Sequence, residues 1–112
     1  MNITVKNNHL ILTESYILNE KIAKQPAAQI NKELSHVTAF LQEGFSDSVV
    51  CSKANILADS VNKDNVKVVN YLKMELEIEF PEEKYLTDHQ LEEFGELFRA
   101  AKLGFVRAFL LY

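Results

Sequence analysis

The sequence predicts an α+β fold, with one antiparallel or mixed sheet and helices packed on a single face of it. Residues 72–80 (LKMELEIEF) alternate apolar and charged side chains, as a strand does when one face meets the core and the other meets water. Residues 26–44 and 87–104 space their apolar side chains three and four apart, as helices covering such a sheet do. With 112 residues and no linker-like stretch, the chain fits one domain, residues 1–112.

The N-terminal residues indicate a hairpin. Asn7 and Asn8 tolerate the positive φ of a tight turn, and the rest of residues 3–13 is rich in apolar and β-branched side chains. Residues 15–25 fit neither strand nor helix clearly, and Pro26 disfavours helix at the residue before it. We therefore expect two short strands before the first helix.

The first long helix is expected from Pro26 to Gly44. Proline suits a first helical turn, where its missing N–H would have no partner, and glycine suits the end of a helix. The apolar stripe expected to face the sheet consists of Ile30, Leu34, Val37, Phe40 and Leu41.

Residues 46–61 (SDSVVCSKANILADSV) leave two alternatives open. A four-three-four spacing of apolar residues favours a second helix, whereas the runs VVC and NILA could each form a short strand. The residues with the helical spacing are Val50, Ala54, Leu57 and Val61.

Residues 66–80 are expected to form a strand that bends near Asn70. Its alternation puts one set of side chains on the core face and the charged set on the other, so the sheet should be covered on one side only. The expected core-facing residues are Leu72, Met74, Leu76, Ile78 and Phe80.

The segment after this strand carries a complete set of helix signals. Thr87 and Gln90 have the spacing of a capping box, and Gly104 can end the helix. Gly95 interrupts the helix, and we interpret it as letting Phe94 and Phe98 pack closely on the sheet, with a contact surface as the alternative. The apolar stripe is Leu91, Phe94, Leu97, Phe98 and Ala101.

The last eight residues, 105–112 (FVRAFLLY), are apolar on both faces of a strand apart from Arg107. They are expected to form an interior strand of the sheet. With that strand, a split βαβ, ferredoxin-like arrangement is one concrete version of the fold. A buried Arg107 would need a partner, either a glutamate on an adjacent strand or a bound anion.

The negative charge lies in the C-terminal part of the chain. Residues 1–70 hold seven lysines and seven acids, whereas residues 71–112 hold nine acids and five bases, which gives the whole net charge of −4. Within residues 75–96 there are nine acids and one lysine, a net charge of −8. Such a field repels nucleic acid and anionic membranes and attracts basic protein surfaces.

The usual signatures of catalysis and cofactor binding are missing. Cys51, the only thiol, lies in no recognised nucleophile motif, and the three glycines are too scattered for a phosphate-binding loop. His89 with Glu92 or Glu93 has helical metal-ligand spacing but lacks a third ligand nearby. We therefore expect no catalytic residue, no metal and no cofactor.

The best functional candidate is the acidic stretch itself. An outer row of glutamates on the strand of residues 66–80, continued by the acids after it, would form a surface for a basic protein. The alternative is a solvated face, partly neutralised by Lys6 or Lys67 on a neighbouring strand. The expected partner-binding residues are Glu75, Glu77, Glu79, Glu82, Glu83, Glu92, Glu93 and Glu96.

Two stretches, residues 46–61 and 80–94 (FPEEKYLTDHQLEEF), resemble parts of the small viral ring nucleases that cleave cyclic oligoadenylates. The first is similar to a helix that follows a Gly-His pair in that family, and the second to a strand end and helix entry. This chain reads VVCS where the Gly-His pair would stand, and Glu79 where a basic residue would precede FPEE. The resemblance therefore implies a relative without the catalytic residues.

Taken together, the sequence predicts a small acidic protein that acts by protein–protein binding, in the manner of an immunity protein or a phage-type inhibitor. The alternatives are a small-ligand or nucleotide-binding domain near Arg107 and a structural subunit of a homo-oligomer. A single cysteine, no basic leader and no long apolar run predict a cytoplasmic protein without membrane contact.

Overall fold

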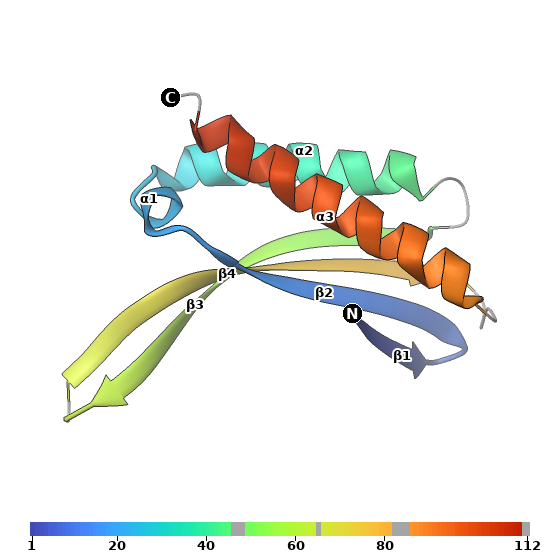
Figure 1. Cartoon of the computed structure of the whole chain (residues 1–112), viewed down its shortest axis with the longest axis horizontal. Coiled ribbons are helices and arrows are strands. Elements are labelled where there is room, and N and C mark those ends of the chain that lie inside the picture. Colours follow the sequence, from blue (N-terminus) through green and yellow to red (C-terminus); the bar gives the residue numbers. More distant parts are fainter. Residues whose placement is uncertain (46–48, 65, 82–85, 111–112) are drawn as a thin grey trace.

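The computed structural model describes residues 1–45, 49–64, 66–81 and 86–110. Four strands form one antiparallel sheet in the order β1-β2-β4-β3, and the helices lie on one face of it (Figure 1). The predicted α+β class is therefore confirmed. The strands are β1 (Asn2–Lys6), β2 (His9–Leu18), β3 (Cys51–Lys63) and β4 (Val66–Phe80), and the helices are α1 (Glu20–Ala23), α2 (Ala27–Gly44) and α3 (Asp88–Leu110).

The N-terminal hairpin forms as predicted. Asn7 and Asn8 connect β1 to β2 with φ values of 52° and 63°, the left-handed conformation that Asn accepts more readily than most residues. Residues 15–18 complete β2, and the one-turn helix α1 follows, capped by the Asn19 side chain, whose Oδ1 accepts from the Lys21 N–H at 2.9 Å.

Strand β4 is the centre of the core. It pairs with β2 on one side and β3 on the other, and Met74, Leu76 and Ile78 on its helix-side face are completely buried. The predicted irregularity near Asn70 is present: Asp59 pairs with Tyr71 and Ser60 with Val69, so Asn70 has no partner in the ladder. This is the pattern of a β-bulge, which bends the strand.

The helical alternative for residues 46–61 is wrong. Residues 51–63 form the edge strand β3, along which Ala54 and Ile56 pack against the core while Leu57 is exposed. The four-three-four spacing of apolar residues was misleading because an edge strand tolerates polar residues on its core side and a leucine on its open side. Residues 46–48 lie outside the described part of the chain.

The expected C-terminal strand is also wrong. Helix α3 passes through Gly104 and continues to Leu110, so residues 105–110 extend the apolar stripe of the helix with the buried Phe105 and Phe109. Residues 111–112 lie outside the described part. The ferredoxin-like version is not formed, because the described elements do not follow its β-α-β-β-α-β order and none of the described strands comes after α3.

The other helix signals are confirmed. Helix α2 begins directly after Pro26 and ends at Gly44. The capping box before α3 is closed in both directions: the Gln90 N–H donates to Thr87 Oγ1 at 3.2 Å, and the Thr87 N–H donates to Gln90 Oε1 at 3.0 Å.

Helices α2 and α3 cover the inner part of the sheet and enclose the core. Aromatic rings join the layers: Phe45 lies 5.0 Å from Phe94 and 5.4 Å from Phe98, centroid to centroid, and Phe94 lies 5.8 Å from Phe80. The radius of gyration is 15.5 Å, above the roughly 13 Å typical of this length, because one end of the β3–β4 ribbon extends past the helices (Figure 1).

Candidate functional site: the open face of the sheet

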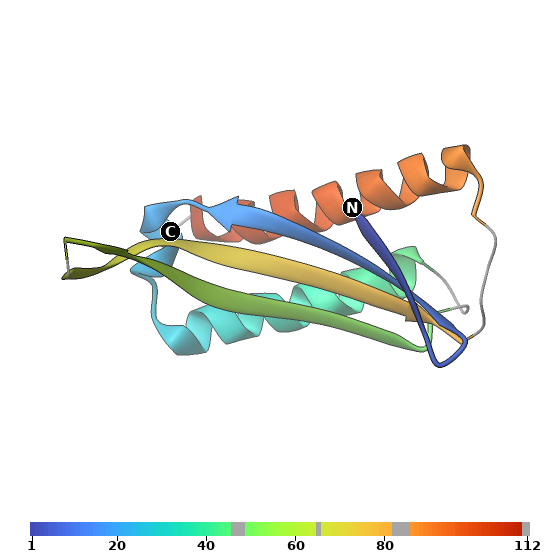
Figure 2. The same cartoon turned by 90° about the horizontal axis from the view of Figure 1, so that it is seen from below.

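The face of the sheet opposite the helices carries the predicted acidic row. Figure 2 views the molecule from this side, with the strands in front of the helices and β1 crossing in front of the other strands near the β1–β2 turn. The antiparallel register assigns one alternate set of side chains from each strand to this open face. These are Asn2, Thr4 and Lys6 from β1, His9, Ile11, Thr13, Ser15 and Ile17 from β2, Lys73, Glu75, Glu77 and Glu79 from β4, and Cys51, Lys53, Asn55 and Leu57 from β3.

Because β4 lies between β2 and β3, the three glutamates run along the middle of the open face. Glu75, Glu77 and Glu79 are each half-buried by neighbouring strands. Glu79 is held by His9, whose Nδ1 lies 2.7 Å from Glu79 Oε1. The end of the row near the β1–β2 turn is therefore paired.

Glu75 and Glu77 have different surroundings. Glu75 stands between Ser15 and Asn55 in the register, two short polar residues without charge. Glu77 stands between Thr13 and Lys53. Neither carboxylate forms an ion pair with any side chain in the described ranges.

Basic residues surround this acidic centre. Lys53 lies across from Glu77 on the edge strand β3, Lys6 lies on the opposite edge strand, and Lys73 continues the row itself. Among the side chains assigned to this face above, three lysines thus balance three glutamates, while the middle remains acidic. Neither neutralising residue expected from sequence lies on a strand next to the row, because Lys6 belongs to β1, beyond β2, and Lys67 belongs to β4 itself.

One end of the open face is apolar. Ile17 and Leu57 flank Lys73 in the register and are 68% and 43% exposed. Both side chains would lose water contact if another molecule covered this face.

The predicted acidic residues do not form one continuous surface. Glu92, Glu93 and Glu96 are exposed on α3, which packs on the other face of the sheet from the β4 row (Figure 1). Glu96 is paired there with Arg99 at 3.3 Å. Glu82 and Glu83 lie outside the described residues. The structure therefore separates the strand glutamates from the helix glutamates.

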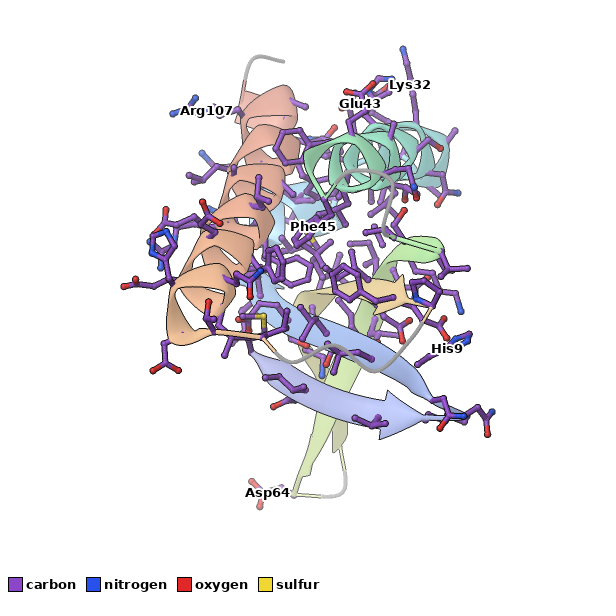
Figure 3. All side chains as sticks on the ribbon, turned by 90° about the vertical axis from the view of Figure 1, so that its right-hand side faces the viewer. His9, Lys32, Glu43, Phe45, Asp64 and Arg107 are labelled. Atoms are coloured by element: carbon purple, nitrogen blue, oxygen red, sulfur yellow. The ribbon has the colours of Figure 1, made fainter. Side chains whose placement is uncertain are left out.

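Arg107 is not a buried strand residue. It is exposed in the last turn of α3 and points away from the sheet (Figure 3), so its guanidinium needs no buried partner. The argument for an anion site at Arg107 assumed the strand that does not form. Arg107 instead complements the negative end of the helix dipole.

The described residues bring no set of metal ligands together. No group of three or more His, Cys, Asp or Glu side chains in the described ranges could hold a metal ion. Cys51 is half-buried on the open face, across from Glu79. His89 is exposed in the first turn of α3.

Tyr16 is the described group with a clearly shifted pKa. It lies on the helix-side face, where burial raises the pKa of its phenol, Glu14 raises it further and Arg99 partly offsets both. The Nζ of Lys102 lies 5.7 Å from the ring centroid. Tyr16 therefore stays a neutral phenol at neutral pH and acts in packing between β2 and α3.

Sequence reasoning did not assign His9 or Lys53 to this site. His9 lies 70 residues from Glu79, so only the pairing of β2 with β4 brings them together. Lys53 belongs to the segment with two open secondary-structure alternatives. Its place beside Glu77 follows from the pairing of β3 with β4, which no local pattern in the sequence indicates.

No protein-family model, curated protein or solved structure matches this chain. The part of residues 46–61 that resembles a helix of the viral ring nucleases is strand β3 from Cys51 onward, so that correspondence is wrong.

In the described parts of the chain, no helix combines the length and the apolar character needed to cross a membrane.

Proposed function

We propose that the protein acts by binding another protein through the open face of its sheet. The observation that supports this is the row of Glu75 and Glu77, which lie in the middle of an uncovered face without an ion-pair partner among the described residues. A face that only meets water does not require a row of glutamates. Neighbouring carboxylates repel each other, and a cation placed between them by a partner would relieve that repulsion.

The face defines the chemistry of the partner. A basic ridge, with Lys or Arg side chains over Glu75 and Glu77, would meet the acidic centre, while Lys6, Lys53 and Lys73 would repel cations placed elsewhere. Apolar groups of the partner would cover Ile17 and Leu57 at the other end. An immunity protein or phage-type inhibitor that occupies a basic, nucleic-acid-binding surface is the concrete form of this proposal.

The test compares two charge-reversed proteins. One carries Glu75→Lys, Glu77→Lys and Glu79→Lys on the sheet, and the control carries Glu92→Lys, Glu93→Lys and Glu96→Lys on α3. Both change the net charge equally, so a difference between them reports position and not total charge. A third protein, with Glu75→Gln and Glu77→Gln, removes charge without adding lysines to the sheet.

Circular dichroism first shows that each variant folds. Tagged forms are then used to capture partners from native lysate. The captured protein is purified, and its affinity for each form is measured at low and moderate salt. We expect a basic partner that the α3 control binds like wild type and the sheet triple variant binds at least 100-fold more weakly. The Gln variant should bind about 10-fold more weakly, and the wild-type affinity should fall with salt. Equal binding by the sheet variant, or loss of binding only in the α3 control, would refute the proposal.

A further inference from the structure

The outer surface of the helix layer has an apolar centre. Helices α2 and α3 run antiparallel, with a groove of about 340 Å³ between them. Most of its lining is apolar or small: Val37, Phe40, Ala100, Ala101, Gly104 and Phe105. The other two lining residues, Glu33 and His36 of α2, pair with each other at 3.3 Å. Phe40 is 40% exposed beside the groove, and Leu103, on the solvent side of α3, is 42% exposed. Exposed large apolar side chains beside a groove are typical of a surface that another molecule covers.

The two ends of this surface carry opposite charges. Lys32 in α2 and Arg107 in α3 lie at the end where α2 begins and α3 finishes. At the other end α2 and α3 approach closely, since a methyl group added at Gly44 would lie 3.3 Å from Leu97 of α3. The exposed acids at this second end are Glu43, Glu93 and Glu96, the last paired with Arg99.

Figure 3 shows how these charges point. Lys32 and Glu43 lie on the side of α2 away from the sheet, and Arg107 extends outward from α3 on the side away from α2. Lys32 and Glu43 are eleven residues apart on α2, or about 16 Å along the helix axis. Helix α2 therefore presents one cation and one anion to the same side, separated by about three turns.

We propose that this face binds a second copy of the chain. A two-fold axis running across the helices stacks each helix, antiparallel, on the same helix of the second copy. Lys32 then faces Glu43 of the second copy, and Arg107 faces its Glu93 and Glu96. The apolar groove and Phe40 lie at the centre, where a symmetric interface buries most surface.

The charges at the two ends of the helix face favour a second copy as the partner, bound in this orientation. A two-fold axis running along the helices would instead stack the basic end on the basic end and the acidic end on the acidic end, which like-charge repulsion disfavours. A purely basic or purely acidic partner would be repelled at one end. The dimer leaves the open face of the sheet uncovered. The dimer proposal therefore does not depend on the partner binding proposed above.

The test uses charge swapping within the dimer. Lys32→Glu and Glu43→Lys each place like charges opposite each other twice in a symmetric dimer, but mixing the two variants relieves this repulsion in a heterodimer. Neither change threatens the helix: both sites are exposed, and Glu43→Lys puts a cation in the last turn, where the helix dipole favours it.

Sedimentation equilibrium over a range of concentrations should show a wild-type dimer. Each single variant should dissociate at least 10-fold more readily, and an equimolar mixture should return to near wild-type dimerisation. Phe40→Ser should weaken the dimer at any salt concentration, whereas Glu77→Lys on the opposite face should leave it unchanged. The proposal would be overturned by a monomeric wild type, by a dimer that neither charge reversal weakens, or by a mixture that dimerises no more tightly than each variant alone. Loss of the dimer in Glu77→Lys would also overturn it, because the interface would then lie on the sheet.

Discussion

At the residue scale, Gly95 shows how a plausible packing role can be wrong. The sequence interpretation was that a glycine inside α3 lets Phe94 and Phe98 approach the sheet. Apart from the backbone of its own helix and its two chain neighbours, no atom of the described residues lies within 4 Å of a Cβ at position 95, so no described neighbour requires the glycine. Glycine then only lowers the stability of the helix, since it costs more backbone entropy on folding than alanine does.

Gly95→Ala should therefore stabilise the protein by up to about 1 kcal/mol. Gly44→Ala is the matched control, because there the new methyl group would crowd Leu97 Cδ2 at 3.3 Å and the gain should be smaller or reversed. Urea denaturation of the two variants beside wild type measures the difference. A destabilised Gly95→Ala protein would contradict this account, because it would show that the added methyl group costs more than the gain in helix propensity.

His9 and Lys53 mark the limit of residue-level prediction. The sequence identified Glu75, Glu77 and Glu79 as an outward row, and the structure confirms that they share the face opposite the buried Met74 and Leu76. The residues beside that row depend on which strand pairs with which. The alternation of one strand carries no information about its neighbours.

At the element scale, the outcome depended on how distinctive each periodicity was. Strand β4 alternates over nine consecutive residues, 72–80, a pattern that no helix fits, and it was predicted with its correct faces. The edge strand β3 mixes Ala54, Ile56 and Leu57 with polar residues, so its pattern also fits a helix. The local spacing of apolar residues could not decide between strand and helix, because the strand is fixed by the pairing of β3 with β4.

The C-terminal segment had the opposite problem. Phe105 and Phe109 are spaced for a helix, as the continuation of Phe98 and Ala101, but also for one face of a strand. Gly104 was taken as the helix end, yet the helix passes through it at a cost of about 1 kcal/mol, which the burial of both phenylalanines offsets.

The capping box gives the element-scale prediction. Thr87→Ala removes the Oγ1 that accepts from the Gln90 N–H, and should lower the free energy of unfolding by about 1 kcal/mol. Ser35→Ala is the control: its hydroxyl donates to the Asn31 carbonyl inside α2, where alanine is the better helix former, so stability should stay equal or rise. Thermal and urea unfolding measure both, and an unaffected Thr87→Ala protein would show that the cap contributes nothing.

At the scale of the whole molecule, the fold presents two faces with different chemistry. The sheet face has an acidic centre with lysines around it, and the helix face has an apolar centre between a basic end and an acidic end. Sequence reasoning combined the acids of β4 and α3 into one surface because they are close in the chain. The sheet lies between the two sets, so the described acids of β4 and those of α3 are on opposite sides of the molecule.

The central claim is that the open face of the sheet binds another protein, and site-specific photo-crosslinking tests it most directly. The photoreactive residue p-benzoylphenylalanine replaces Ser15, beside Glu75 on the sheet face, or Ser35, exposed on α2. After irradiation in native lysate, mass spectrometry identifies each adduct. We expect a covalent adduct to a basic protein from position 15, lost when Glu75 and Glu77 are changed to Lys, and no such adduct from position 35. The same partner captured from position 35 and not from position 15 would contradict the account.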